Sequence, residues 1–112
     1  MSALSSDELH TKAHLTIVKT YLLTGLIVFA LMMIAGVLLR AAQGGSMLEI
    51  SPTLFYQIMT LHGAGMVGAA GLAGLAVNWY FLSRYVPLSP RILTISFLLS
   101  LIAVVMLSLI HI

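Results

Sequence analysis

The sequence predicts an all-α membrane protein with three membrane-spanning helices. Hydrophobic residues make up 61% of its 112 residues and charged residues only 7%, whereas an average soluble domain is about 25% charged. Three long apolar stretches follow one another along the chain, and a helix of roughly 20 apolar residues crosses the hydrocarbon core of a bilayer. So few charges cannot cover a globular surface, which excludes a soluble enzyme, a nucleic-acid-binding protein and a disordered tail.

Each apolar stretch is expected to be a helix, because a backbone inside lipid must satisfy its own hydrogen bonds. The predicted segments are a polar N-terminal tail over residues 1–16 and helices over residues 17–39, 53–82 and 91–106. Lys19 is the only charged residue in the first helix, and the second contains no Asp, Glu, Lys or Arg. The pair Ser51-Pro52 is typical of a helix start. There is no cysteine, so disulfides and thiolate metal sites are excluded.

The last six residues, LSLIHI (107–112), resemble a translated sequencing adapter. We expect the native sequence to continue differently after Met106, which leaves the third helix truncated at about 15 native residues, too few for a full span. His111 is therefore not expected to be a ligand. The alternative is the natural short tail of a membrane helix.

Positive charges flank the predicted helices unevenly. They are Lys12 and Lys19 at the N-terminal side, Arg40 in the first connection beside Glu49, and Arg84 and Arg91 in the second connection. Positive residues concentrate on the cytoplasmic side of membrane proteins. We therefore expect a cytoplasmic N-terminus and second connection, with the first connection outside.

His62, in the run MTLHGAG of the second predicted helix, is the residue most indicative of function. It lies roughly 13 Å from the outer end of that helix, at 1.5 Å per residue. An ionisable side chain at that depth is costly and needs a partner, and it marks a candidate functional site. The pattern leaves two interpretations open: a metal or haem ligand, or a neutral imidazole bonded to a neighbouring helix. In the ligand interpretation, the carbonyl of Ile58 is a candidate acceptor for the other ring nitrogen.

Small residues share the helix face of His62, and a flat macrocycle ligated by His62 would need such a low face beside it. The residues of this face are Gly65, Met66, Ala69, Ala73 and Ala76. Close packing of helices by itself explains the glycines well, since Ala64/Gly68 and Ala70/Gly74 have the spacing of small-residue packing motifs.

Other polar residues have more ordinary interpretations. Arg40 at the end of the first helix either contacts a haem substituent or snorkels to the interface. His10 and His14 lie four residues apart, a spacing that can bind metal, although histidines in a solvated tail are common. Tyr21, Tyr56 and Thr60 are candidates for hydrogen bonds or a proton path, and Trp79 and Tyr80 are typical interface anchors.

Taken in order, these features resemble subunit I of the haem–copper oxidases. The motifs that carry the resemblance are VLLRAAQGG at the end of the first predicted helix, FYQIMTLHG in the second and SPRILTISFLL at the start of the third. The separation of Arg40 and His62 also resembles that family. The similarity covers most of residues 17–106, which corresponds to the first two helices and part of the third of the family's subunit.

The resemblance implies that the chain is an N-terminal fragment of the catalytic subunit of a respiratory terminal oxidase in the cell (inner) membrane. His62 is then one axial ligand of a low-spin haem of a or b type, and Arg40 contacts the periphery of that haem. The family reduces oxygen to water with electrons from cytochrome c or quinol, translocates protons and works with further subunits such as subunit II. Its high-spin haem and copper ion are held by later helices, so the fragment alone has no catalytic residue and is not expected to be active.

The sequence departs from the family in the connection before the third helix. Many members carry there an aspartate that opens a proton channel, whereas this chain reads YVPLSPR. The departure favours a divergent oxidase, or a branch of the family with a different proton path, over a close relative of the mitochondrial type. Two alternatives remain: a large subunit like that of nitric oxide reductase, and a small multi-span transporter or assembly protein without haem.

Overall fold

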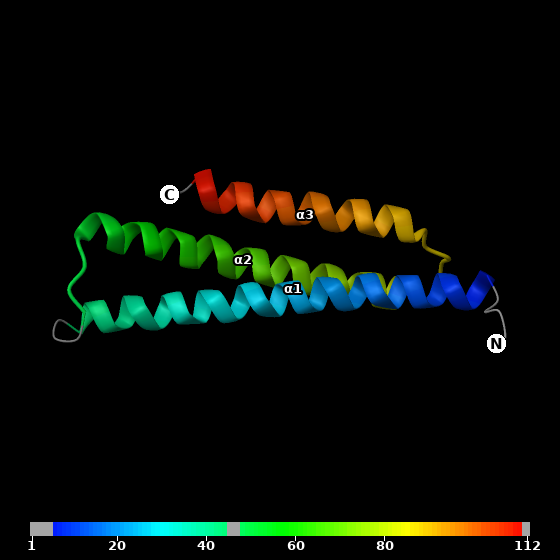
Figure 1. Cartoon of the computed structure of the whole chain (residues 1–112), viewed down its shortest axis with the longest axis horizontal. Helices are drawn as coiled ribbons and strands as arrows, with labels where there is room; N and C mark the ends of the chain where they lie inside the picture. The colour runs from blue at the N-terminus through cyan, green and yellow to red at the C-terminus, as the bar shows by residue number, and fades with distance from the viewer. Residues whose placement is uncertain (1–5, 45–47, 111–112) are drawn as a thin grey trace.

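Three long helices form the part of the chain that the structure describes, residues 6–44 and 48–110 (Figure 1). In this computed structural model the helices are α1 (Ser6–Gln43), α2 (Pro52–Leu82) and α3 (Pro90–Ile110), and these described ranges contain no strand. All three helices are long and apolar enough to cross a membrane. The all-helical, three-span prediction is confirmed at this level.

The first helix is longer than the predicted span at both ends. It begins at Ser6 and so includes most of the segment predicted as a polar tail. Arg40 lies in its last turn, where positive charge interacts favourably with the negative end of the helix dipole.

The second helix begins where the sequence predicts. The hydroxyl of Ser51 accepts a hydrogen bond from the backbone N–H of Leu54 at 3.3 Å, and Pro52 occupies the first turn. Proline is tolerated there because its missing N–H would have no partner in the helix. The chain reverses direction between Gln43 and Pro52, so α2 runs back along α1 (Figure 1).

Glycines allow α1 and α2 to approach each other closely. A Cβ atom on Gly25 would lie 3.4 Å from the backbone oxygen of Ala69 on α2. A Cβ atom on Gly65 of α2 would overlap the side chain of Met32 on α1. Together with the contacts of Val18 and Tyr21, these close approaches keep α1 and α2 in contact from Val18 to the region around His62.

The third helix lies against α2 and the first half of α1. Of its residues only Leu93 is buried, and Phe97 packs edge-on against Tyr21 with ring centroids 4.8 Å apart. Further along, a Cβ on Gly68 would lie 2.6 Å from Cγ1 of Val104. The helix continues unbroken through Met106 to Ile110, so the backbone there shows no change at the boundary of the predicted non-native tail, which stays a prediction.

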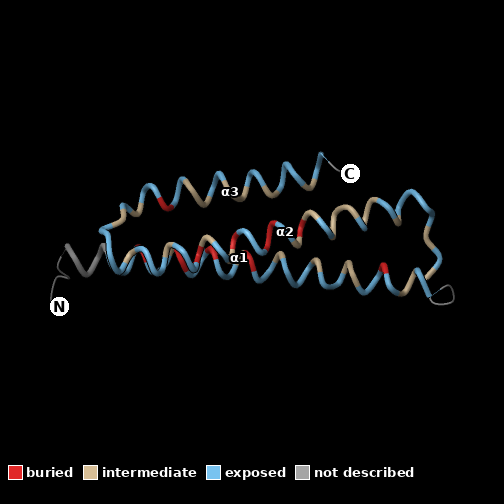
Figure 2. Tube along the Cα trace, turned by 180° about the vertical axis from the view of Figure 1, so that it is seen from behind, coloured by how far each residue is buried: buried red, intermediate tan, exposed pale blue. Residues whose placement is uncertain are grey.

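A small core lies in the half of the bundle where all three helices meet. It consists of Val18, Tyr21, Leu72 and Ala76. Elsewhere most large apolar residues are exposed, and exposed residues are pale blue in Figure 2. Outward apolar side chains are favourable in lipid, which is as apolar as they are, and the elongated shape of 63 × 27 × 24 Å suits a membrane-spanning bundle.

The two ends of the bundle differ in charge. We call the end at which α1 begins, α2 ends and α3 begins the basic end, because it carries Lys12, Lys19, Arg84 and Arg91. The opposite end, where α1 ends and α2 begins, carries Arg40 and Glu49. The prediction that the basic end is cytoplasmic stays a prediction.

Candidate functional site

His62 lies between α1 and α2 and is partly buried. Its Nδ1 atom is 2.7 Å from the backbone oxygen of Met32 on α1. The ring reaches that oxygen because residue 36 has no side chain: a Cβ atom on Gly36 would lie 2.9 Å from Cε1 of His62. The site thus consists of a histidine from one helix and a backbone groove at a glycine of the other.

The prediction that the Ile58 carbonyl accepts a hydrogen bond from His62 is wrong. The acceptor is the carbonyl of Met32 on the neighbouring helix and not that of Ile58 on its own helix. Side chains point outward from their own helix axis, and here the groove at Gly36 offers the ring a carbonyl directly opposite. The interhelical alternative that the sequence left open therefore describes the hydrogen bond correctly.

The Met32 carbonyl also determines which ring nitrogen of a neutral His62 carries the proton. A carbonyl only accepts, so Nδ1–H donates to it and Nε2 keeps a free lone pair. Within the described part of the chain, Nε2 has no hydrogen-bond partner. An imidazole that donates one N–H to a carbonyl and presents its other nitrogen is the usual arrangement of a metal-ligating histidine.

Much of the small-residue face beside His62 is not open. Gly65, Ala69 and Ala76 are buried, and the first two lie against Met32 and Gly25 of α1. On the side covered by α1, this face is therefore not available to a macrocycle, and the packing interpretation describes it. Here the small residues serve helix packing, because they let the two backbones approach.

The two predicted packing motifs on α2 differ in their surroundings. Gly68 of the first motif is buried against Val104 of α3, whereas Gly74 of the second has no atom within 4 Å of an added Cβ. The packing interpretation holds for Ala64/Gly68. Among the described residues, nothing packs against Gly74.

Arg40 does not reach His62 in this structure. It is exposed, and its guanidinium donates to Oε1 of Gln43 at 3.0 Å. It lies eight residues beyond Met32, about 12 Å along the helix axis at 1.5 Å per residue. The two residues share one end of the bundle, and a role of Arg40 at a haem periphery stays a prediction.

The histidines near the N-terminus are separated from this site by most of the length of α1. His14 is only 7% exposed, so the expectation of a solvated tail histidine is wrong for it. His14, Val18, Tyr21 and Gly25 are all buried, and their helical spacing is the signal that identifies this face of α1 in the sequence. Among residues whose side chains are described, no three His, Cys, Asp or Glu side chains form a cluster.

The side chains of His10 and His111 lie outside the described part of the chain, so their interpretations stay untested. Thr60 donates to the carbonyl of Tyr56 at 2.8 Å, within its own helix, and Tyr56 is 61% exposed. In the described part of the chain, neither Thr60 nor Tyr56 forms a hydrogen bond with His62.

Tyr21 and Trp79 lie at the core near the basic end. The hydroxyl of Tyr21 and Nε1 of Trp79 are enclosed, and neither has a hydrogen-bond partner among the described residues. Tyr80 instead interacts with the guanidinium of Arg84, which donates to its hydroxyl and lies over its ring. That pair at the end of α2 is the arrangement expected of an interface anchor.

Comparisons of the chain with protein-family models, with curated proteins and with solved structures found no match. The class that the fold defines is an all-helical chain with three helices long and apolar enough to span a membrane.

Proposed function

We propose that this chain forms the first helices of the catalytic subunit of a haem–copper terminal oxidase, with His62 as one axial ligand of its low-spin haem. The observation that carries the proposal is the environment of His62. Nδ1 is bonded to the Met32 carbonyl, and Nε2 has no hydrogen-bond partner in the described part of the chain. The motifs around Arg40 and His62 support the same function.

The donor set around His62 fits an axial ligand. A low-spin haem with two axial histidines passes single electrons and has no open position for a substrate. The Met32 carbonyl holds the ring in the tautomer whose Nε2 is free to bind iron. Gly36 leaves space for the ring, and the second axial ligand comes from a helix beyond this chain.

The remainder of the proposal concerns the complete subunit. It reduces oxygen to water with electrons from cytochrome c or quinol and translocates protons, together with subunit II, in the inner membrane. The high-spin haem and copper belong to later helices. Arg40, at the same end of the bundle as His62, is the cation closest along α1 to that site and is proposed to contact the haem periphery.

A second candidate is favoured by a different observation. Gly65 and Ala69 pack against α1, and the Met32 carbonyl satisfies one nitrogen of His62. A small multi-span transporter or assembly protein, with His62 as a packing residue, shows the same features. A nitric oxide reductase-like large subunit is the alternative within the same superfamily.

The experiment is a His62→Ala substitution in the product of the uninterrupted gene, with reduced-minus-oxidised optical spectra of its membranes. We expect the low-spin haem band to disappear, because one of its two axial ligands is lost. His14→Ala, the same substitution at the other end of α1, is the control and should keep the band. A His62→Ala protein that retains its low-spin haem would rule the ligand role out and favour the packing role.

A further inference from the structure

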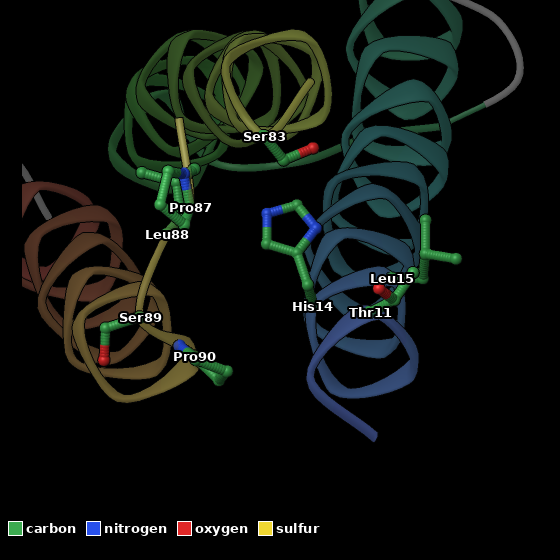
Figure 3. Close-up of a pocket in the computed structure, with 8 residues that line it drawn as sticks. All are labelled: Thr11, His14, Leu15, Ser83, Pro87, Leu88, Ser89 and Pro90. Carbon is green, nitrogen blue, oxygen red and sulfur yellow. The ribbon is translucent and has the colours of Figure 1, made fainter. Parts of the chain in front are cut away.

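A cavity of about 620 Å³ opens at the basic end of the bundle. The N-terminal part of α1 forms one side, and the segment joining α2 to α3 forms the other (Figure 3). The lining residues are Thr11, His14, Leu15, Ser83, Pro87, Leu88, Ser89 and Pro90. Its volume lies within the range of ligand sites, roughly 300–1,000 Å³.

The side chain of His14 projects into this region from α1, toward Ser83 and Leu88 (Figure 3). It is 7% exposed, and its Nε2 atom is enclosed without a hydrogen-bond partner. Enclosing a polar atom without a partner costs free energy. A group that binds in the cavity and hydrogen-bonds to the ring removes that cost, so the buried imidazole indicates a polar ligand.

The first turn of α3 faces the cavity from the opposite side through Ser89 and Pro90. Pro90 has no N–H, and the Leu93 N–H is bonded to the Ser89 carbonyl at 3.2 Å. The N–H groups of this turn without a partner in the helix are those of Arg91 and Ile92, which follow the lining residues along the chain. They also lie at the positive end of its dipole, which attracts anions. Ser89 also lines the cavity and carries a hydroxyl. The candidate donors therefore belong to two separate elements, His14 on α1 and the start of α3.

The charged residues that adjoin the lining residues in the sequence are positive, which also favours an anion. Lys12 follows the lining residue Thr11, and Arg91 follows Pro90. Of the three acidic residues in the sequence, Glu49 lies at the opposite end, and Asp7 and Glu8 belong to the N-terminal part of the chain. Four cations against two acids leave this end positive.

We propose that this cavity binds a phosphate group, which His14 and the N-terminus of α3 hold by hydrogen bonds. A tetrahedral oxyanion presents oxygens in several directions and so matches donors from two facing elements. The group comes from an anionic phospholipid headgroup or from free phosphate. The cavity lies where α2 ends and α3 begins, the level at which lipid headgroups meet spanning helices. The proposal is independent of any role of His62.

The test is a titration of the full chain in an uncharged maltoside micelle at constant ionic strength. The two probes are inorganic phosphate and dihexanoyl phosphatidylglycerol, and NMR follows the backbone amides of Ser89 and Arg91. We expect saturable shifts. Binding of the lipid alone identifies the headgroup as the source, and binding of inorganic phosphate alone identifies a soluble anion; both results support the site.

Three variants distinguish specific binding in the cavity from non-specific attraction of an anion to positive charge. His14→Leu removes a hydrogen bond to a charged group and should weaken binding about tenfold or more, and Ser89→Ala should weaken it several-fold. Lys19→Gln, the control, removes a charge away from the cavity and should change affinity less than about twofold.

Two results would overturn the proposal: no saturable binding of either probe, or equal affinities in His14→Leu and Lys19→Gln. Circular dichroism checks that His14→Leu keeps its helices. If His14→Leu loses its helices, Ser89→Ala is compared with Lys19→Gln instead, and equal affinities of these two variants would overturn the proposal.

Discussion

The contact between His62 and α1 depends on the absence of one side chain. Gly36 faces the imidazole so closely that an added Cβ would lie 2.9 Å from Cε1 and 3.5 Å from both ring nitrogens. A Cβ atom at position 36 would therefore require the ring or one of the helices to shift. Gly36 therefore acts as a positioning residue for His62, whichever function His62 has.

Gly36→Ala tests this close approach. We expect the free energy of unfolding in mixed detergent micelles to fall by about 1–3 kcal/mol, the usual cost of overpacking. The His62 ring nitrogens should also change their NMR shifts, because the bond to Met32 is stretched or lost.

Gly71→Ala is the matched control, since no atom lies within 4 Å of a Cβ added there. Its stability should stay unchanged or rise by up to about 1 kcal/mol, the difference in helix propensity between the two residues. Equal effects of the two substitutions would mean that His62 does not fill the groove at Gly36.

Two further residues show why burial at this scale is hard to foresee. His14 and Tyr21 are both buried, although the first lies in a polar stretch and the second in an apolar one. They are two helical turns apart on one face of α1. Their common spacing marks one face of α1, but its burial depends on how α2, α3 and the segment between them pack against that face.

At the scale of the element, α2 is the helix with the clearest local signals. Ser51 caps its first turn through the Leu54 N–H, and Pro52 fits the first helical position. The cap satisfies one of the N–H groups that a helix start leaves without a partner. The start of α2 is therefore determined by adjacent residues.

Removal of this cap should have a measurable cost. Ser51→Ala should lower the free energy of unfolding by about 1 kcal/mol, measured by circular dichroism in mixed micelles. Ser83→Ala at the other end of α2 is the comparison: its hydroxyl donates to the Tyr80 carbonyl within the same helix, and its loss should cost less than about 0.5 kcal/mol. A larger cost at Ser83 than at Ser51 would contradict this account.

The position of α3 is determined less by local sequence signals than the start of α2 is, and more by its contacts with the other helices. Its contacts with the others run through Leu93, Phe97 and Val104. Gly68 on α2 creates the space that Val104 occupies. The remaining apolar surface of α3 points outward, as it does in a helix whose other neighbours are lipid or further helices.

At the scale of the whole molecule, charge lies at the ends and apolar surface between them. The three helices place the start of α1 and the α2–α3 connection at one end, and the α1–α2 connection at the other (Figure 1). In a membrane these two ends lie on opposite sides. The positive charges predict that the basic end is cytoplasmic.

Single cysteines can test this topology, since the chain contains none of its own. In right-side-out vesicles we expect a membrane-impermeant maleimide to label Ser51→Cys at once and Ser89→Cys only after permeabilisation. Leu98→Cys, in the middle of α3, should stay unlabelled in both conditions. Labelling of Ser51→Cys and Ser89→Cys from the same side would refute the three-span arrangement, and the reverse pattern would refute the predicted orientation.

The sequence by itself determined the all-helical class, the three apolar helices and the start of α2, and it marked His62 as a candidate site residue. These follow from composition, from the length of apolar stretches and from local capping, all of which act between neighbours in the chain. Only the tertiary structure decided that His62 donates to Met32, that α1 covers the small-residue face, and that His14 is buried beside a cavity. These depend on which turns of two helices meet, and that is set by packing between residues far apart in sequence, such as Gly36 with His62.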